Sequence, residues 1–328
     1  YASCERVFNP KIRNKPVVVL SNNDGCVIAR SNEAKVLGIQ MGAPAFKNRH
    51  IFKKYGVYIF STNFALYGDF SSRVMSVLAE AVPQIEIYSI DEAFMDYSGL
   101  PEPMEHALGL RNKVMQWTGI PTSIGIAETK TLAKVANRIA KKEVQSGVFW
   151  LHCPDMIRDY LKRLPVSKLW GIGRRYAEKL ELYSIQTAYE LTQRSDSWIQ
   201  QHMSIVGLKM VQELRGIPCF ELETAWQRKK SICTSRTFGE EVCHFSQLAQ
   251  ALSTYAAMCG AKLRKQGSCA GILTIFILTN PFKYQYRANY KGIRKIRLKT
   301  PTNDSLEIVS AAVSALRSIY RSDCIYKK

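Results

Sequence analysis

Residues 85–97, IEIYSIDEAFMDY, contain the pattern on which the fold of this chain depends. Apolar and polar residues alternate on both sides of its centre, which predicts two short strands with a tight connection at residues 89–92. Adjacent carboxylates on a straight strand point to opposite faces, but at a bend Asp91 and Glu92 can converge on one point. They would then repel each other, so the bend needs a counter-charge, most simply a divalent cation with oxygen ligands. A solvated hairpin tip is the alternative, and the stretch by itself favours that alternative.

The composition indicates an anionic polymer as the partner. The 328 residues carry a formal net charge of +19, and residues 229–328 hold 17 Lys and Arg against 5 Asp and Glu. A merely soluble basic protein does not require such a concentration of charge in one segment. The sequence also shows no amphipathic anchor, so DNA or RNA is favoured over a membrane surface. The length predicts two to four domains.

The remaining compositional features favour a cytoplasmic protein. The nine cysteines include no CxxC pair and no His/Cys cluster, which fits a reducing cytosol better than a disulfide framework or a zinc site. The longest apolar run, residues 270–278, is far too short to span a bilayer. No signal peptide is expected at the start of the chain.

The first part of the chain predicts a strand pair followed by two helices. Residues 16–20 and 26–29 read as buried strands, and the turn at residues 23–25, Asn-Asp-Gly, supplies positive-φ residues. Helices are expected at residues 32–37 and from about 61 to 81.

A second helical region follows the acidic stretch. We expect a helix at residues 105–118, a strand at 122–126 and a helix at 129–142. The last helix has an apolar face and a basic stripe, which consists of Lys130, Lys134, Arg138 and Lys141. A charged stripe is usually a solvated face. Like charges at this spacing cost stability, however, so a stripe without an acidic partner at i+4 is less usual.

Residues 169–175, LWGIGRR, predict a phosphate-binding turn. Gly171 and Gly173 form a tight turn directly before a helix that begins near Arg174. Exposed amides at that helix start, beside Arg174 and Arg175, are suited to phosphate. Helical segments on both sides make the region look like a helix-hairpin-helix that grips a sugar-phosphate backbone without reading bases.

The last hundred residues predict a small α+β domain. A polar linker is expected up to residue 230. The elements expected after it are a strand at 231–238, a helix at 246–265, a strand at 270–279, a basic strand at 294–299 and a helix at 304–320. Alternation along the basic strand puts Lys295, Arg297 and Lys299 on one face and Arg294 on the other. That cationic face is suited to phosphates.

Together these motifs resemble the Y-family translesion DNA polymerases, most closely the UmuC-type catalytic subunits of bacterial SOS polymerase V. The resemblance covers the whole chain in the family's order. It rests on YASCE at 1–5, LSNNDGCVIAR at 20–30, YSIDEAF at 88–94, TKTLAK at 129–134, WGIGRR at 170–175 and SRTFG at 235–239.

The resemblance implies an α+β multidomain fold of the right-hand type. Its parts would be a palm at residues 1–7 and 65–152, fingers at 8–64, a helical thumb with the helix-hairpin-helix at 153–222, a linker at 223–228 and a DNA-binding little finger at 229–328.

The resemblance also implies an error-prone, template-directed DNA polymerase that acts in translesion synthesis, DNA repair and the SOS response. Asp91 and Glu92 would be the catalytic carboxylates that bind two Mg²⁺ ions. Tyr1 matches the steric-gate aromatic, whose ring lies where a ribose 2′-hydroxyl would project. Lys141 matches the triphosphate-binding lysine.

Further site residues follow from the same resemblance. Asn32 and Lys35 occupy positions where many relatives carry Tyr and Arg against the triphosphate. The expected DNA-binding residues are Gly171, Gly173, Arg174, Arg175, Arg236, Lys295, Arg297 and Lys299.

The family's first metal-binding Asp lies five residues before the gate tyrosine, which is ahead of residue 1. The chain is therefore expected to be a fragment that lacks one of three catalytic carboxylates and is weakly active or inactive by itself. Relatives also extend past Lys328 with a tail that binds partners. Implied partners are primer–template DNA, deoxynucleoside triphosphates, a dimeric SOS accessory subunit, a recombinase filament and a sliding clamp, with no membrane.

Two other interpretations compete with this one. A DNA-binding module without catalysis could occupy damaged ends, but it would not need Asp91, Glu92 and Lys141. The second competing interpretation is a member of the related polymerase IV branch. Asn32 and the turn at residues 22–25 favour polymerase V over that branch.

Overall fold

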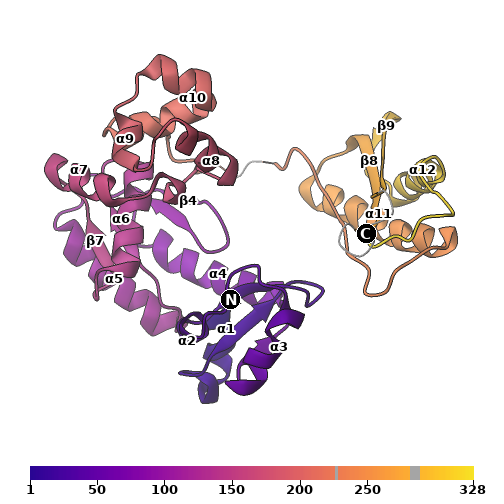
Figure 1. The fold of residues 1–328 in the computed structure, drawn as a ribbon, viewed down its shortest axis with the longest axis horizontal. Coiled ribbons are helices and arrows are strands. Elements are labelled where there is room, and N and C mark those ends of the chain that lie inside the picture. The colour runs from indigo at the N-terminus through magenta and orange to yellow at the C-terminus, as the bar shows by residue number, and fades with distance from the viewer. Residues whose placement is uncertain (226–227, 281–288) are drawn as a thin grey trace. The chain divides into compact units, whose positions relative to one another are not determined.

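The protein forms two compact units, Tyr1–Ala225 and Trp226–Lys328 (Figure 1). Each unit has a buried hydrophobic core of its own. The computed structural model describes residues 1–225, 228–280 and 289–328. Residues 226–227 of the predicted linker and 281–288 of the predicted little finger lie outside the described residues. Within the described ranges, no helix has the length and hydropathy needed to cross a membrane.

A three-stranded sheet in the order β2-β1-β3 lies near the N-terminus. The buried strand β1 (Val17–Leu20) runs antiparallel to β2 (Val27–Arg30), which confirms the predicted strand pair. Asp24, with φ of 53°, supplies the left-handed residue of the turn. The third strand, β3 (Tyr58–Phe60), runs parallel to β1 and was not predicted.

Helices flank this sheet. α1 (Ala2–Phe8) and α3 (Ala45–Lys54) were not predicted. Phe52 is the one buried residue of α3, so that helix has little apolar periodicity to detect. α2 (Asn32–Val36) confirms the first predicted helix. α4 (Phe64–Ala79) begins later than expected, because the Asn63 side chain caps it by accepting a hydrogen bond from Leu66 N at 3.1 Å.

The acidic stretch forms the predicted hairpin. β4 (Ile85–Ile87) pairs antiparallel with β5 (Ala93–Met95), and Glu86 lies opposite Phe94. The Ser89 amide donates to the Glu92 carbonyl at 3.0 Å and closes the turn.

The elements after this hairpin also follow the prediction. α5 (Pro103–Thr118) and α6 (Lys130–Lys142) are present, and the strand at 122–126 is reduced to β6 (Ile124–Ile126). β6 runs parallel to β7 (Val148–Trp150), with α6 as the crossover. α4, α5, β6 and β7 share one buried apolar cluster.

Gly125 in β6 allows α6 to lie directly against the strand. A Cβ at this position would lie 2.0 Å from the backbone nitrogen of Asn137. Backbone cannot give way as a flexible side chain can, so Gly125→Ala is expected to lower the free energy of unfolding by at least about 1–3 kcal/mol. Thermal denaturation would measure this as a fall in Tm. Gly68→Ala is the matched control, because nothing lies within 4 Å of the added Cβ there. Equal Tm values for the two variants would contradict the packing argument.

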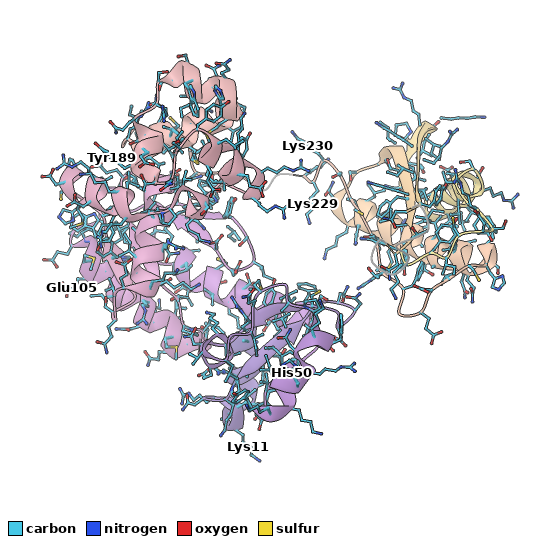
Figure 2. All side chains as sticks on the ribbon, viewed as in Figure 1. Lys11, His50, Glu105, Tyr189, Lys229 and Lys230 are labelled. Atoms are coloured by element: carbon cyan, nitrogen blue, oxygen red, sulfur yellow. The ribbon has the colours of Figure 1, made fainter. Side chains whose placement is uncertain are left out.

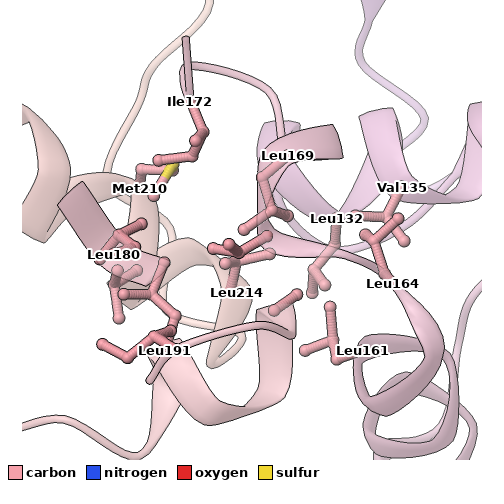
Figure 3. Close-up of a cluster of buried hydrophobic side chains, with 14 of the residues drawn as sticks. Leu132, Val135, Leu161, Leu164, Leu169, Ile172, Leu180, Leu191, Met210 and Leu214 are labelled. Atoms are coloured by element: carbon pink, nitrogen blue, oxygen red, sulfur yellow. The ribbon is translucent and has the colours of Figure 1, made fainter. Parts of the chain in front are cut away.

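Four helices complete the first unit: α7 (Pro154–Arg163), α8 (Arg174–Leu182), α9 (Ala188–Thr192) and α10 (Asp196–Leu214). Their buried side chains and the apolar face of α6 belong to one cluster. Figure 3 shows Leu132 and Val135 of α6 beside Leu161, Leu164 and Leu214 in that cluster.

The second unit is a small α+β domain. Its elements are α11 (Phe245–Gln266), β8 (Ala270–Leu278), β9 (Lys291–Thr302) and α12 (Ser305–Arg317). These four confirm the predicted helices and strands. β8 and β9 pair antiparallel, and α12 packs against α11 and both strands.

The predicted strand at residues 231–238 is wrong. Residues 231–238 belong to no strand. The last residues of the chain contact β8 at its C-terminal end, where Leu278 N donates to the Lys328 carbonyl at 2.8 Å. The predicted segment is bound by side chains of α11 instead. Lys262 Nζ donates to Thr234 Oγ1 at 2.9 Å, and Phe238 N alone reaches the terminal segment, at the Lys327 carbonyl (2.8 Å).

Candidate functional site

The turn between β4 and β5 presents two carboxylates. Asp91 is exposed, and its Oδ1 accepts a hydrogen bond from Ser89 Oγ at 2.8 Å. The Asp91 amide donates to the same hydroxyl oxygen at 3.3 Å. The Glu92 side chain is 41% exposed. Both carboxylates therefore extend from a single, internally hydrogen-bonded bend.

Lysines of α6 supply counter-charges to this hairpin. Lys134 forms an ion pair with Glu92, and Lys130 forms one with Glu86. The second pair is nearly buried, with side-chain exposures of 11% for Lys130 and 9% for Glu86. Two of the four residues of the basic stripe, Lys130 and Lys134, thus have acidic partners on another element, so this half of the stripe is more than a solvated face.

The donors at the bend fit a divalent cation. The carboxylates of Asp91 and Glu92 and the hydroxyl of Ser89 are hard oxygen ligands of the kind that Mg²⁺ prefers. Among the described residues, no group of three or more His, Cys, Asp or Glu is arranged to hold a metal ion. Asp91, Glu92 and Ser89 thus present oxygen donors of the kind that a divalent cation requires.

Tyr1 shares the site with Asp91. Burial raises the pKa of the Tyr1 phenol, and the negative charge of Asp91 raises it further. The Tyr1 ring stacks on Tyr67, with centroids 4.3 Å apart and planes at 12°. The predicted gate residue and one predicted metal ligand therefore lie within each other's electrostatic reach.

A cationic cluster forms where α2 approaches the end of α6. Partial burial lowers the pKa of Lys35, and the positive charges of Lys141 and Arg30 lower it further. Lys35 Nζ donates to Asn32 Oδ1 at 3.0 Å. The structure thus brings together Asn32, Lys35 and Lys141. Arg30 was missed from the sequence, where an Arg at a strand end carries no distinguishing signal.

Helix α6 contributes one lysine to the carboxylate turn and another to the cationic cluster. Lys134, which pairs with Glu92, and Lys141 are seven residues apart and therefore lie on similar sides of the helix. At 1.5 Å per residue they are about 10 Å apart along its axis.

The glycine turn lies beside the acidic hairpin. Trp170 meets Tyr88 at 5.6 Å and Phe94 at 5.7 Å between ring centroids. Gly171 has φ of 85°, which favours glycine, and Gly173 precedes α8 as its N-cap. Arg174 and Arg175 are exposed in the first turn of α8.

The N-terminal end of α6 is fixed by a buried carboxylate that sequence reasoning missed. Glu213 of α10 has no exposed surface. It accepts hydrogen bonds from Thr131 N at 2.8 Å, from Thr131 Oγ1 at 2.7 Å and from Phe220 N at 3.0 Å. A Glu within an amphipathic helix gives no sequence signal of burial, because its partners lie on distant segments.

In the second unit, Lys295 and Arg297 share one face of β9 as expected, whereas a shift of the pairing register after Arg297 leaves the face of Lys299 untested. Lys295, Arg297 and Lys299 are exposed, whereas Ile296 and Leu298 between them are partly covered. Lys295 lies opposite exposed Thr274, and Arg294 lies opposite buried Ile275 on the other face. Arg236 is also exposed. Lys229 and Lys230, at the start of this unit, are exposed as well (Figure 2).

Solved structures with this architecture define the class. A structure titled Y-family DNA polymerase chimera Dbh-Dpo4(243-245)-Dbh matches with a TM-score of 0.79 and covers 99% of this chain and 93% of that chain, at 20% sequence identity. The fold is that of the Y-family DNA polymerases, with a helix-hairpin-helix and an α+β little finger.

The sequence defines the family. The impB/mucB/samB family model matches residues 1–138, its C-terminal domain matches 229–328, and the HHH motif of the IMS family matches 154–183. Protein UmuC of Salmonella typhimurium is 44% identical over the whole chain and 79% of its own length. Protein ImpB of Salmonella typhimurium is 43% identical over the whole chain and 78% of its own length. The chain belongs to the impB/mucB/samB family.

Proposed function

We propose that this protein extends a primer 3′-hydroxyl with deoxynucleoside triphosphates on a DNA template, including damaged template. It is an enzyme, a DNA-directed DNA polymerase of the Y family. One observation carries the proposal. The carboxylate turn of Asp91 and Glu92, the ring of Tyr1 and the cluster of Lys35 and Lys141 are brought together in one unit. The likeness to UmuC supports a role in translesion synthesis, DNA repair and the SOS response.

Each group of the site has a role in this reaction. Asp91 and Glu92 would hold the Mg²⁺ ions, which when bound lower the pKa of the primer hydroxyl and stabilise charge on the leaving pyrophosphate. By the family resemblance, a third carboxylate ahead of Tyr1 belongs to the same set. Lys134 keeps Glu92 paired before the site is loaded.

The cationic cluster would bind the triphosphate. Burial lowers the pKa of Lys35, and repulsion from the positive charges of Lys141 and Arg30 lowers it further. A bound polyanion would relieve this repulsion and favour the protonated form of Lys35. Asn32 orients the Lys35 ammonium through their hydrogen bond of 3.0 Å.

DNA binding would come mainly from phosphate contacts. The turn of Gly171 and Gly173, with Arg174 and Arg175, presents exposed amides and charges for one backbone segment. Arg236 and the exposed side of β9 would contact others. Such contacts position the duplex and carry no sequence information directly.

We assign the palm to residues 1–7 and 65–152, the fingers to 8–64, the thumb to 153–222, the linker to 223–228 and the little finger to 229–328. The family resemblance supports cytoplasmic action with a dimeric SOS accessory subunit, a recombinase filament and a sliding clamp as partners.

Primer extension by the full-length protein tests this function. A labelled primer–template with a templating abasic site, and an undamaged control, would be incubated with Mg²⁺ and deoxynucleoside triphosphates. Extension on both templates is expected. Tight binding by fluorescence anisotropy without any extension would favour the non-catalytic DNA-binding module instead.

Tyr1→Ala in the full-length protein is expected to relax sugar selection. The 2′-hydroxyl is the group by which RNA and DNA building blocks differ, and the Tyr1 ring would exclude it sterically. A steric contact of this kind is worth about tenfold to 200-fold in discrimination. Single-nucleotide incorporation with matched ribo- and deoxynucleotides measures the ratio. An unchanged ratio would remove Tyr1 from this role.

A further inference from the structure

Two aromatic residues of α4 brace the Tyr1 ring. Tyr67 lies parallel beneath it, with centroids 4.3 Å apart and planes at 12°. Phe64 meets the same ring edge-on at 6.0 Å and 89°. Phe64 and Tyr67 are three residues apart on α4 and meet each other at 6.3 Å. We call Tyr67 the floor and Phe64 the side wall of the Tyr1 ring. Both belong to the first turn of α4.

The floor is itself fixed at its far end. Tyr67 is only 2% exposed and belongs to a buried cluster with Cys4, Val19 and Phe70. Its hydroxyl donates a hydrogen bond to Glu5 Oε1 at 2.7 Å. Burial raises the pKa of Tyr67, and the bond to Glu5 raises it further, so the phenol remains a donor through the neutral range.

Glu5 closes the arrangement through α1. It lies one helical turn after Tyr1, and its amide donates to the Tyr1 carbonyl at 3.2 Å. The backbone of Tyr1 is thus connected through α1 to the Glu5 carboxylate, from there to the Tyr67 hydroxyl, and through the Tyr67 ring back to the Tyr1 ring. A ring held in this way cannot retreat without displacing a packed neighbour.

We propose that Tyr67 and Glu5 are positioning residues that set the sugar selectivity of the nucleotide site. A steric filter works only if its wall does not move when pressed, and a displacement of about 1 Å is enough to change how a reacting group is placed. Tyr67 blocks the retreat of Tyr1, and Glu5 keeps Tyr67 in place. This inference rests on the proposed role of Tyr1 as the gate.

A purely structural role for Tyr67 would produce a different result. Loss of core packing lowers stability and reduces incorporation of both sugars together. Loss of the brace lets the Tyr1 ring yield, so incorporation of the ribonucleotide rises relative to the deoxynucleotide. The discrimination ratio therefore separates the two roles, and Tm reports the packing loss separately.

The test compares variants of the full-length protein by single-turnover incorporation of dCTP and CTP opposite template G. Tyr67→Leu removes the floor and is expected to raise the ribo-to-deoxy ratio about 2- to 10-fold, the range of an aromatic pair. Glu5→Ala is expected to raise it less. Glu5→Gln, which retains an acceptor oxygen, should restore the original ratio. In a Tyr1→Ala background, Tyr67→Leu should add no further rise.

Controls keep the outcomes distinct. Phe70→Leu alters a buried ring one turn further along α4 that meets Phe8, and it should leave the ratio unchanged. Tyr67→Phe keeps the stacked ring but loses the hydroxyl, and it replaces Tyr67→Leu if that variant does not fold. Its ribo-to-deoxy ratio should rise by the same amount as that of Glu5→Ala. The proposal is overturned if Tyr1→Ala relaxes selection but the Tyr67 and Glu5 variants do not, or if Phe70→Leu relaxes it equally. If Tyr1→Ala itself has no effect, the gate assignment fails first and the brace fails with it.

Discussion

Replacing Asp91 or Glu92 with Ala in the full-length protein is expected to abolish nucleotide incorporation while DNA affinity stays nearly intact. The two carboxylates extend from one bend, and none of the residues that we assign to DNA binding belongs to that bend. Each loss removes a metal ligand, and a deficit of about 4 kcal/mol in transition-state stabilisation corresponds to a rate about a thousandfold lower. Affinity comes from phosphate contacts elsewhere and should survive.

Single-turnover extension and fluorescence anisotropy on the same primer–template would measure rate and affinity separately. Asp96→Asn is the matched control. Asp96 follows β5 on the same hairpin, and its carboxylate accepts a hydrogen bond from Ser98 N at 2.9 Å. It should retain incorporation. If either Asp91→Ala or Glu92→Ala incorporated nucleotide at nearly the original rate, the assignment of metal ligands would be wrong.

Removing the charges of β9 is expected to lower DNA affinity strongly. Lys295 and Arg297 lie on one face of the strand, and Lys299, also exposed, lies where the pairing register shifts. Each phosphate that such a side chain neutralises contributes about 0.9 to the slope of log affinity against log salt. The triple Ala variant should therefore lose affinity and reduce the slope by about 2.7, equally for all template sequences. Deletion of residues 229–328 should weaken binding further and leave the Asp91 and Glu92 turn intact.

Anisotropy titrations between low and moderate salt would give both quantities. A triple Ala variant of Lys11, Lys53 and Lys54, exposed residues of the first unit, removes the same charge and is the control. A β9 variant with the same affinity and slope as this control would show that the little finger is not the main DNA grip.

Most helices and strands could be predicted from patterns that are local in the sequence. The hairpin at residues 85–97 was predictable because alternation and turn residues lie within a few positions of one another. α6 was predictable for the same reason, since its apolar face and its Thr129 cap are contiguous in sequence. The helix at residues 45–54 has one buried side chain and left no such pattern. The predicted strand at 231–238 failed because this segment is bound by residues distant in sequence, with Lys262 donating to Thr234 and Phe238 N donating to the Lys327 carbonyl.

Long-range pairings could not be predicted. The ion pair of Lys134 with Glu92 joins residues 42 positions apart, and the bond of Glu213 to Thr131 joins residues 82 positions apart. Local charge and periodicity do not encode such separations, since they depend on how α6 is placed against the hairpin and α10. The roles of the candidate residues were predicted from the family resemblance. Their spatial neighbours, including Arg30 and Tyr67, became known only from the structure.

The position of α6 has a consequence for how the chain can be divided. Its apolar face, with Leu132 and Ile139, lies in the same cluster as the helices from Pro154 to Leu214. An excised thumb that began at residue 153 would lose this cover, expose its own buried side chains such as Leu161 and Leu214 to water, and tend to aggregate. Exchange of thumbs between relatives, in the laboratory or by recombination, would preserve solubility only if α6 travelled with the segment that it covers. The functional boundary between catalysis and DNA grip is therefore not a boundary at which the chain can be cut.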